Sequence, residues 1–349
     1  MLIENFVKLD IDLNARGEGN LTAVMWACWE GHSDLIKIIL ENAACVDFNL
    51  KDNRGWTCFQ RACGKGNFNV AKILVDNSDA LNIDLNTKDN SGQTALHLAC
   101  KWGYLDLVIM FIENSTSLRI EFDTKDNEGQ TPFLLACRWG HFNVVKMFIM
   151  SSTTSGIDLN ARYKDGQTGF LLACRHGHVN TVKIFMDNSF NFSIDLNTKD
   201  HEGQTGLYLA CKWSHFNLVK MFIENSATLG IDLNIKDNTG QTTLHLACRW
   251  GFINVVQMIV DNSATLGIDL NIKDNAGQTP FHLACRWCRF NVAKMFMENS
   301  VTLSIDLNAK DNEGQTPFQL ASKSDCYLTP SFLDLMLKNA DTFKIDLKI

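Results

Sequence analysis

The chain has 349 residues, of which 46% are hydrophobic and 20% charged, a balance that is typical of folded proteins and excludes a wholly disordered chain. The net charge of −7 disfavours wholesale coating of nucleic acid. No apolar stretch approaches the roughly 18–20 residues that a membrane helix requires. No basic region followed by an apolar core opens the sequence, so we expect neither a membrane span nor a signal peptide.

A pattern with a period of 37 residues runs through the sequence. Gly55-Trp56-Thr57 stands in register before seven Gly-Gln-Thr triplets, which begin at Gly92, Gly129, Gly166, Gly203, Gly240, Gly277 and Gly314. Thr22 opens a weaker first copy that is two residues shorter. Such a period indicates a solenoid, a propeller or another repeat array. We predict a partial repeat at residues 1–17, consisting of a second helix and loop only. An array of nine copies with a degenerate last copy follows at 18–349.

Residues 124–160 illustrate the elements expected in each copy, in chain order. A turn-forming segment at 125–129 is followed by Thr131 and Pro132, which fit an N-cap and a first helical residue. Apolar residues over 133–137 predict one face of a short helix, which Gly140 ends in a left-handed conformation. Asn143 is expected to cap a second helix. No copy shows the alternation of a strand, so we predict an all-α solenoid.

The slot of Gly140 is not glycine in every copy. Ser214 and Cys288 occupy it in two of them. If this turn requires a left-handed backbone, a residue with a Cβ atom costs roughly 1–2 kcal/mol there. We therefore expect these two turns to be left-handed and locally weak.

The segment from Gly277 to Cys285 reads Gly-Gln-Thr-Pro-Phe-His-Leu-Ala-Cys and resembles the G-x-T-P-L-H-x-A signature of the ankyrin repeat family. The resemblance covers nearly the whole chain. It implies an antiparallel helix pair in each repeat, with β-turns that project as fingers. It also implies that the histidines in the signature slot brace neighbouring fingers by hydrogen bonds: His97, His245 and His282. The family's usual repeat has about 33 residues, and we expect the four extra residues here to lengthen the loop before each finger.

Eight cysteines recur at one slot: Cys28, Cys63, Cys100, Cys137, Cys174, Cys211, Cys248 and Cys285. Equivalent Cα atoms of stacked helices should lie roughly 8–10 Å apart, whereas a disulfide needs about 4.4–6.8 Å. We therefore interpret these cysteines as small buried hydrophobes. Reduced thiols fit a cytoplasmic location, with the nucleus also open.

Pairs of a basic and an aromatic residue follow the apolar residues of the first helix in six copies. Arginine and tryptophan are enriched among the hot spots of protein interfaces, and in the ankyrin family the matching positions line the concave groove. We predict that these pairs bind a partner: Lys101 and Trp102, Arg138 and Trp139, Arg175 and His176, Lys212 and Trp213, Arg249 and Trp250, Arg286 and Trp287. The alternative is that the tryptophans are structural filler.

The predicted function is non-enzymatic protein binding through the concave groove and finger tips, by a monomeric array that is part of a longer chain. The alternatives are a structural spacer or tether without a specific ligand and, against the acidic net charge, binding of single-stranded nucleic acid. No Walker loop, nucleophile elbow or His-Glu-x-x-His motif is present, so we predict no enzyme activity, cofactor or metal. Recurrent finger aspartates such as Asp126 are interpreted as turn formers whose charge the preceding lysine offsets.

Overall fold

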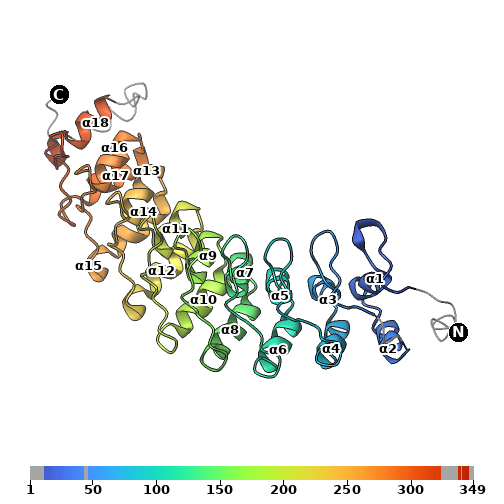
Figure 1. Ribbon diagram of the computed structural model, residues 1–349. Coiled ribbons are helices and arrows are strands. Elements are labelled where there is room, and N and C mark those ends of the chain that lie inside the picture. Colours follow the sequence, from blue (N-terminus) through green and yellow to red (C-terminus); the bar gives the residue numbers. More distant parts are fainter. Residues whose placement is uncertain (1–11, 43–45, 324–336, 339, 346–349) are drawn as a thin grey trace. The chain divides into compact units, whose positions relative to one another are not determined.

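The computed structural model describes residues 12–42, 46–323, 337–338 and 340–345 (Figure 1). Within these residues every regular element is a helix and none is a strand, as the sequence predicts. The helix expected in residues 1–5 of the partial repeat lies outside the described residues. The chain divides into two compact units, residues 1–173 and 174–349, each with its own stack of helix pairs.

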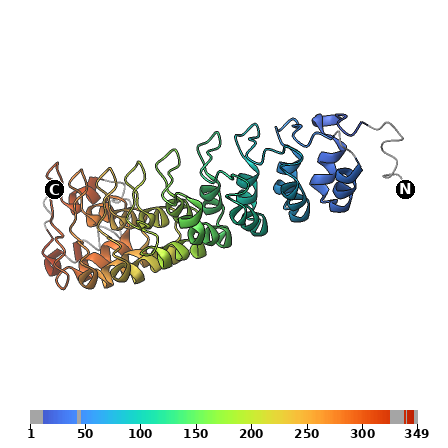
Figure 2. The same cartoon turned by 60° about the horizontal axis from the view of Figure 1, so that its bottom comes forward.

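Unit 1 places its helix pairs side by side in chain order (Figure 1). The first helices of the pairs contact one another from α1 through α3 and α5 to α7, and the second helices form an adjacent row from α2 to α8. Figure 2 shows the fingers between successive pairs projecting together from one side of this unit. The elements are η2 (Glu18–Asn20), α1 (Ala23–Glu30), α2 (Ser33–Asn42), α3 (Cys58–Lys65), α4 (Phe68–Asp76), α5 (Ala95–Trp102), α6 (Leu105–Glu113), α7 (Pro132–Trp139) and α8 (Phe142–Ser155).

Unit 2 has the same construction. Its first helices contact one another from α11 through α13 and α16 to α18, and its second helices run from α10 through α12 and α14 to α17. Helix α9 (Gly169–Arg175) spans the division between the units. The further elements are α10 (Val179–Asn188), α11 (Gly206–Lys212), α12 (Phe216–Leu229), α13 (Thr243–Trp250), α14 (Ile253–Asp261), α15 (Ser263–Leu266), α16 (Pro280–Arg286), α17 (Phe290–Asn299) and α18 (Pro317–Lys323).

Local sequence signals set the bounds of the first helices. In α7 the Thr131 hydroxyl accepts a hydrogen bond from the backbone N–H of residue 134, and Gly140 leaves the helix with φ of 73°. Ser214 and Cys288 adopt the same left-handed backbone, with φ of 61° and 54°. The conformation predicted for this slot is therefore confirmed in copies that lack glycine.

The second helices begin two residues earlier than an N-cap at the asparagine slot predicts. Helix α8 begins at Phe142, and His141 occupies its N-cap position without a side-chain cap. Asn143 lies inside the first turn, so the prediction that it caps the helix is wrong. The cause is the short connection, in which the left-handed Gly140 leads almost directly into the helix and accepts a 2.9 Å hydrogen bond from the N–H of Phe142.

The four extra residues of each copy are not always loop. Helices α8 and α12 continue through them and reach 14 residues before ending at the left-handed Gly156 and Gly230. In the next copy the same residues form the short helix α15, which ends at Gly267. The expectation of a longer loop is therefore wrong for these copies. The segment before the glycine contains no helix breaker, so the helix continues until a left-handed residue ends it.

The fingers of neighbouring repeats are joined by asparagine. In unit 1 the backbone N–H of Asn90 donates to the carbonyl of Arg54 at 3.0 Å, and its side-chain amide donates to the carbonyl of Asn53 at 2.9 Å. In unit 2 Asn275 repeats both bonds. A Cβ atom on Gly240 would lie 2.4 Å from Oδ1 of Asn275, so glycine is required at this finger position by close approach as well as by its positive φ.

A second row of asparagines joins the loops before the fingers. In unit 2 the side chain of Asn234 donates to the carbonyl of Gly267 at 2.9 Å and accepts from the N–H of Asp269 at 3.0 Å. Asn197 makes the equivalent pair of bonds with the following loop. Each side chain therefore satisfies one donor and one acceptor of the next repeat and keeps successive repeats in register.

The cores of both units are apolar and contain the predicted cysteines. All eight recurrent cysteines have side chains with 0% exposure. A Cβ atom on Gly169 would lie 2.8 Å from Sγ of Cys137, which shows how closely the first helices approach in unit 1. Burial raises the pKa of thiols such as Cys63 and Cys100 well above its ordinary value. They therefore stay protonated and act as small packing groups, as predicted.

Candidate functional site

In unit 1 the predicted pairs stand at the C-terminal ends of first helices. Lys101 and Trp102 end α5, and Arg138 and Trp139 end α7. The two indoles are 55% and 53% exposed. Nζ of Lys101 lies 5.9 Å from the centroid of the Trp102 ring, and Nη1 of Arg138 donates to Oε1 of Gln130 in its own finger at 3.2 Å. Half of each large ring thus remains available on the surface.

In unit 2 the pairs occupy the same place, at or directly after the last residue of α9, α11, α13 and α16. Trp213, Trp250 and Trp287 are 49%, 53% and 44% exposed. His176 replaces tryptophan in the first of these pairs and stacks on His178, with ring centroids 6.0 Å apart. The row of exposed indoles in this unit therefore runs through three successive repeats.

Two basic side chains of unit 2 contact indole rings and leave about half of each tryptophan exposed. Cζ of Arg175 lies 5.5 Å from the centroid of the Trp213 ring, and Cζ of Arg249 lies 5.1 Å from that of Trp287. These are cation–π distances, and each joins one repeat to the next. Lys212 instead forms an ion pair with Glu202 of its own finger at 3.5 Å. The pairs are thus oriented side chains with about half of each ring facing solvent.

Polar residues that follow three of the inter-helix turns also position the pairs. Nε2 of His141 donates to the backbone carbonyl of Lys101 at 3.0 Å, and His215 makes the same bond to Arg175. Arg289 replaces histidine and donates from Nε to the carbonyl of Arg249 at 2.8 Å. In these three copies a carbonyl at the end of the first helix is thereby capped by the next repeat. The recurrence of donor side chains at this slot is the sequence signal for these contacts.

The histidines of the signature slot serve the fold. Nδ1 of His97 accepts from the backbone N–H of Thr94 at 3.1 Å, and Nε2 contacts the carbonyl of Gln130 in the next finger at 3.1 Å. His245 and His282 repeat this arrangement. Burial lowers the pKa of His97, and the hydrogen bond to Gln130 opposes that shift only in part. The predicted bracing of neighbouring fingers is confirmed.

The finger aspartates also serve the fold. Oδ1 of Asp126 accepts from the backbone N–H groups of Glu128 and Gln130 at 3.0 and 2.8 Å, so the predicted turn-forming role is confirmed. The predicted offset by lysine is not seen as an ion pair among the described residues. Instead, Nζ of Lys88 donates to the backbone carbonyl of Lys125 in the next repeat at 3.0 Å. The lysines extend the row of bonds between repeats.

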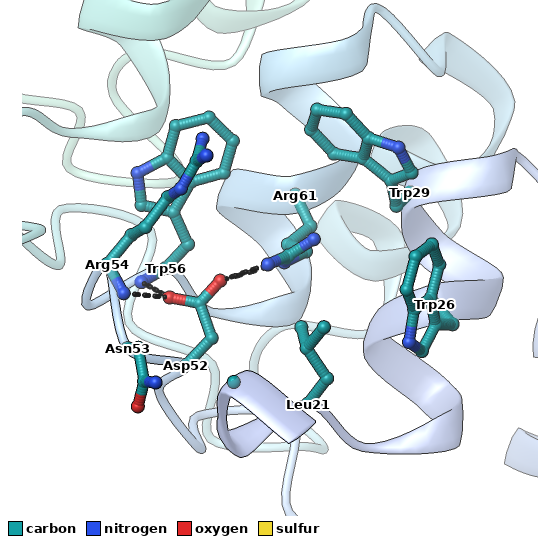
Figure 3. Close-up of a pocket in the computed structure, with 9 residues that line it drawn as sticks. Leu21, Trp26, Trp29, Asp52, Asn53, Arg54, Trp56 and Arg61 are labelled. Atoms are coloured by element: carbon teal, nitrogen blue, oxygen red, sulfur yellow. Dashed lines mark hydrogen bonds and ion pairs between the residues drawn. The ribbon is translucent and has the colours of Figure 1, made fainter. Parts of the chain in front are cut away.

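A pocket that the sequence analysis missed lies in the first two repeats of unit 1 (Figure 3). Trp26 and Trp29 come from α1 on one side, and Arg54 and Trp56 come from the finger before α3 on the other. Arg61 of α3 lies between them. The cavity has a volume of about 330 Å³. We call it the tryptophan pocket.

Two kinds of structure are absent from the described part of the chain. Over residues 12–42, 46–323, 337–338 and 340–345, no helix combines the length and apolarity needed to cross a membrane. In the same residues no three histidine, cysteine, aspartate or glutamate side chains are placed to hold a metal ion.

Comparison with known proteins agrees with the repeat fold. The family model for ankyrin repeats in sets of three copies matches residues 1–89, 24–121, 79–163, 148–237, 173–274, 226–311 and 264–346. Among solved structures, the chain is similar to the ankyrin repeat domain of Bcl-3, a member of the IkappaB protein family. The identity is 24% and the TM-score 0.57, over 66% of this chain and 95% of that one. No curated protein matches the sequence. With the family model matched from residue 1 to residue 346, the chain belongs to the ankyrin repeat family.

Proposed function

We propose that the chain binds a partner protein, without catalysing a reaction on it, through the basic–aromatic pairs of unit 1 and of unit 2. Ankyrin repeats are in general protein–protein interaction modules. The observation that carries the proposal is the half-exposed tryptophan that recurs beside a basic side chain in successive first helices. Isolated exposed apolar residues are ordinary, but a repeated row of large indoles is typical of an interaction surface.

The chemistry of the pairs favours a partner with acidic and apolar residues. The arginines and lysines attract carboxylates, and desolvation of an indole supplies the contact energy. Stacked repeats lie roughly 8–10 Å apart, and an extended strand advances about 3.3 Å per residue. Every third residue of an extended partner segment would therefore meet the next tryptophan within one unit. We expect apolar residues at that spacing, with acidic residues between them.

The test is capture of partners by the purified chain and by matched variants. Trp213→Ala with Trp250→Ala should lose the captured partner, whereas Phe190→Ala should not, although Phe190 is 75% exposed. Helical content should stay unchanged in all variants, because the two indoles lie about half outside the packed structure. Equal capture by all variants would favour a spacer or tether over a binding surface.

Reversing the charge of the basic residues separates long-range attraction of the partner from the contact that the tryptophans make. Arg138→Glu with Arg249→Glu should slow association with the captured partner and reduce its dependence on salt, because exposed charges mainly steer encounter. Tight, strongly salt-dependent binding of an unstructured oligonucleotide that is lost in the tryptophan variant would support the nucleic-acid alternative instead.

A further inference from the structure

The tryptophan pocket has the composition of a cation cage, but its cation is already present. The centroids of Trp29 and Trp56 lie 6.0 Å apart. Cζ of Arg61 lies 5.4 Å from the first centroid and 6.0 Å from the second. The side chain of Arg61 is only 12% exposed. The space beside these two ring faces is therefore filled by the protein's own guanidinium group.

The carboxylate that lines the pocket, Asp52, and the nearby Asp89 are both engaged. One oxygen of Asp52 accepts from Nε of Arg61 at 2.9 Å, and the other accepts from the backbone N–H groups of Arg54 and Trp56 at 2.7 and 2.8 Å. The Asp52 side chain is 1% exposed. Oδ2 of Asp89 accepts from Nε1 of Trp56 at 2.9 Å. A cationic ligand would find no unengaged carboxylate in this wall, so the usual partner of an aromatic cage is disfavoured.

The charge left over at the pocket is positive. Arg54 is exposed, and its Cζ lies 5.9 Å from the Trp56 centroid. Nζ of Lys65 is exposed and lies 5.1 Å from the Trp29 centroid. Neither side chain forms an ion pair with a carboxylate anywhere in the described residues. Arg54 therefore lines the cavity with its charge available to a ligand, and Lys65 adds a second positive charge beside Trp29.

The remaining wall of the pocket is apolar. Trp26 is 50% exposed, and Leu21 lines the cavity beside it (Figure 3). A volume of about 330 Å³ is at the lower end of the range for ligand sites, which suits one bulky side chain rather than a large cofactor. A ligand with an anionic group on Arg54 and an apolar group against Trp26 would match both the positive and the apolar surface of the pocket.

We infer that the tryptophan pocket binds an acidic peptide segment of a partner protein, with an aromatic side chain against Trp26 and Leu21 and a neighbouring carboxylate on Arg54. The inference does not depend on the basic–aromatic pairs, which lie on other repeats. It adds a second contact point of different geometry, built from the first helix of one repeat and the finger of the next.

The experiment uses the full chain, in which all eight tryptophans are replaced by 5-fluorotryptophan. Each fluorinated indole gives its own ¹⁹F signal, and single Trp→Phe variants assign the signals. The probe is a synthetic peptide of four glutamate–phenylalanine repeats. The comparison peptides carry lysine in place of glutamate, or serine in place of phenylalanine. The acidic aromatic peptide should shift the Trp26 and Trp56 signals with one common Kd. Both comparison peptides should bind at least about tenfold more weakly.

Arg54→Glu should remove those shifts, and its exposed position makes a folding defect unexpected. The Trp213 and Trp250 signals report separately on the surface of the proposed function. Their response to the peptide should be the same in Arg54→Glu as in the wild type. Arg54→Ala provides a second, milder test and should weaken binding less than the charge reversal. The inference is overturned if the Trp26 signal does not move, if the lysine peptide moves it equally, or if folded Arg54→Glu binds like wild type.

Discussion

Replacing Ser214 with glycine should stabilise unit 2, although the change removes atoms. Ser214 holds a left-handed backbone at φ of 61°, where a Cβ atom costs roughly 1–2 kcal/mol. Its side chain is exposed, so little packing is lost. Glycine also raises the conformational entropy of the unfolded chain, which lowers the stability of the folded unit by about 0.4–1 kcal/mol. The net gain should be about 0.5–1 kcal/mol.

The reverse substitution at the same slot is the matched control. In Gly177→Ser the new Cβ atom would lie 2.6 Å from Nδ1 of His215, whose ring bonds the carbonyl of Arg175. Displacing that ring adds the loss of a hydrogen bond, about 1 kcal/mol, to the cost of the left-handed backbone. The lower entropy of the unfolded chain with serine offsets about 0.4–1 kcal/mol of this cost, so Gly177→Ser should destabilise the unit by about 1–2.5 kcal/mol.

Local exchange is the right measurement, because repeat arrays unfold in segments and a single unfolding free energy is poorly defined. The amide of His215 donates to the carbonyl of Ala210 at 2.8 Å, directly after the turn. Its hydrogen exchange should slow about two- to fivefold in Ser214→Gly. Unchanged or faster exchange, with an unchanged denaturation midpoint, would show that left-handed strain at this turn is not a significant cost.

Three further changes probe the bonds between repeats and the proposed surface. Replacing the buried histidines with the glutamine of the equivalent slot in α3 should keep the fold but flatten its acid dependence: His97→Gln, His245→Gln and His282→Gln. Burial lowers the pKa of these rings, so their contribution is complete above about pH 6.5 and is lost as the pH falls below it, by at most about 1.4 kcal/mol per pH unit for each ring. Urea denaturation midpoints at pH 7 and pH 5.5 measure this, and an equal fall of the midpoint in the wild type and the variant would contradict it. Gly240→Ala should destabilise more than Gly230→Ala in the same assay, because only the first places a Cβ atom against a neighbouring finger. Equal losses would mean that this finger contact is weak. Trp139→Ala with Trp250→Ala should cost about 2 kcal/mol or more in partner binding by calorimetry. Loss of helical content by circular dichroism would show that these rings are structural.

The repeat pattern predicted the helix pairs well because each conserved slot carries a local physical requirement. A left-handed turn follows the first helix whether glycine, Ser214 or Cys288 stands there. Capping of the second helix by Asn143 failed for the opposite reason. Asparagine is a good N-cap on average, but the turn at Gly140 leaves room for only one residue before the helix, and that residue is His141.

The tryptophan pocket could not be placed from one copy, because its walls come from two. Three departures from the repeat nevertheless signalled it. Trp56 replaces the glutamine of the recurrent triplet, and Arg61 replaces a leucine that is buried in later copies, such as Leu98. Gly64 stands where later copies carry the basic residue, and a Cβ atom there would lie 2.7 Å from the Trp56 ring. These changes fit one another, since Gly64 leaves room for the Trp56 ring and Arg61 packs against that ring.

The position of the basic–aromatic pairs follows from what the other slots must do. The finger asparagine, the loop asparagine and the signature histidine each bond the next repeat through the side chain, so a change there breaks the register. The basic residue of a pair bonds the next repeat through its backbone carbonyl, which any residue could supply, and Arg175 and Arg249 add a cation–π contact from the side chain. Its side chain is therefore less constrained by the fold than those of the bonded slots. A binding surface built at this slot can change its partner chemistry from repeat to repeat, as His176 among the tryptophans illustrates, while the stack beneath it stays the same.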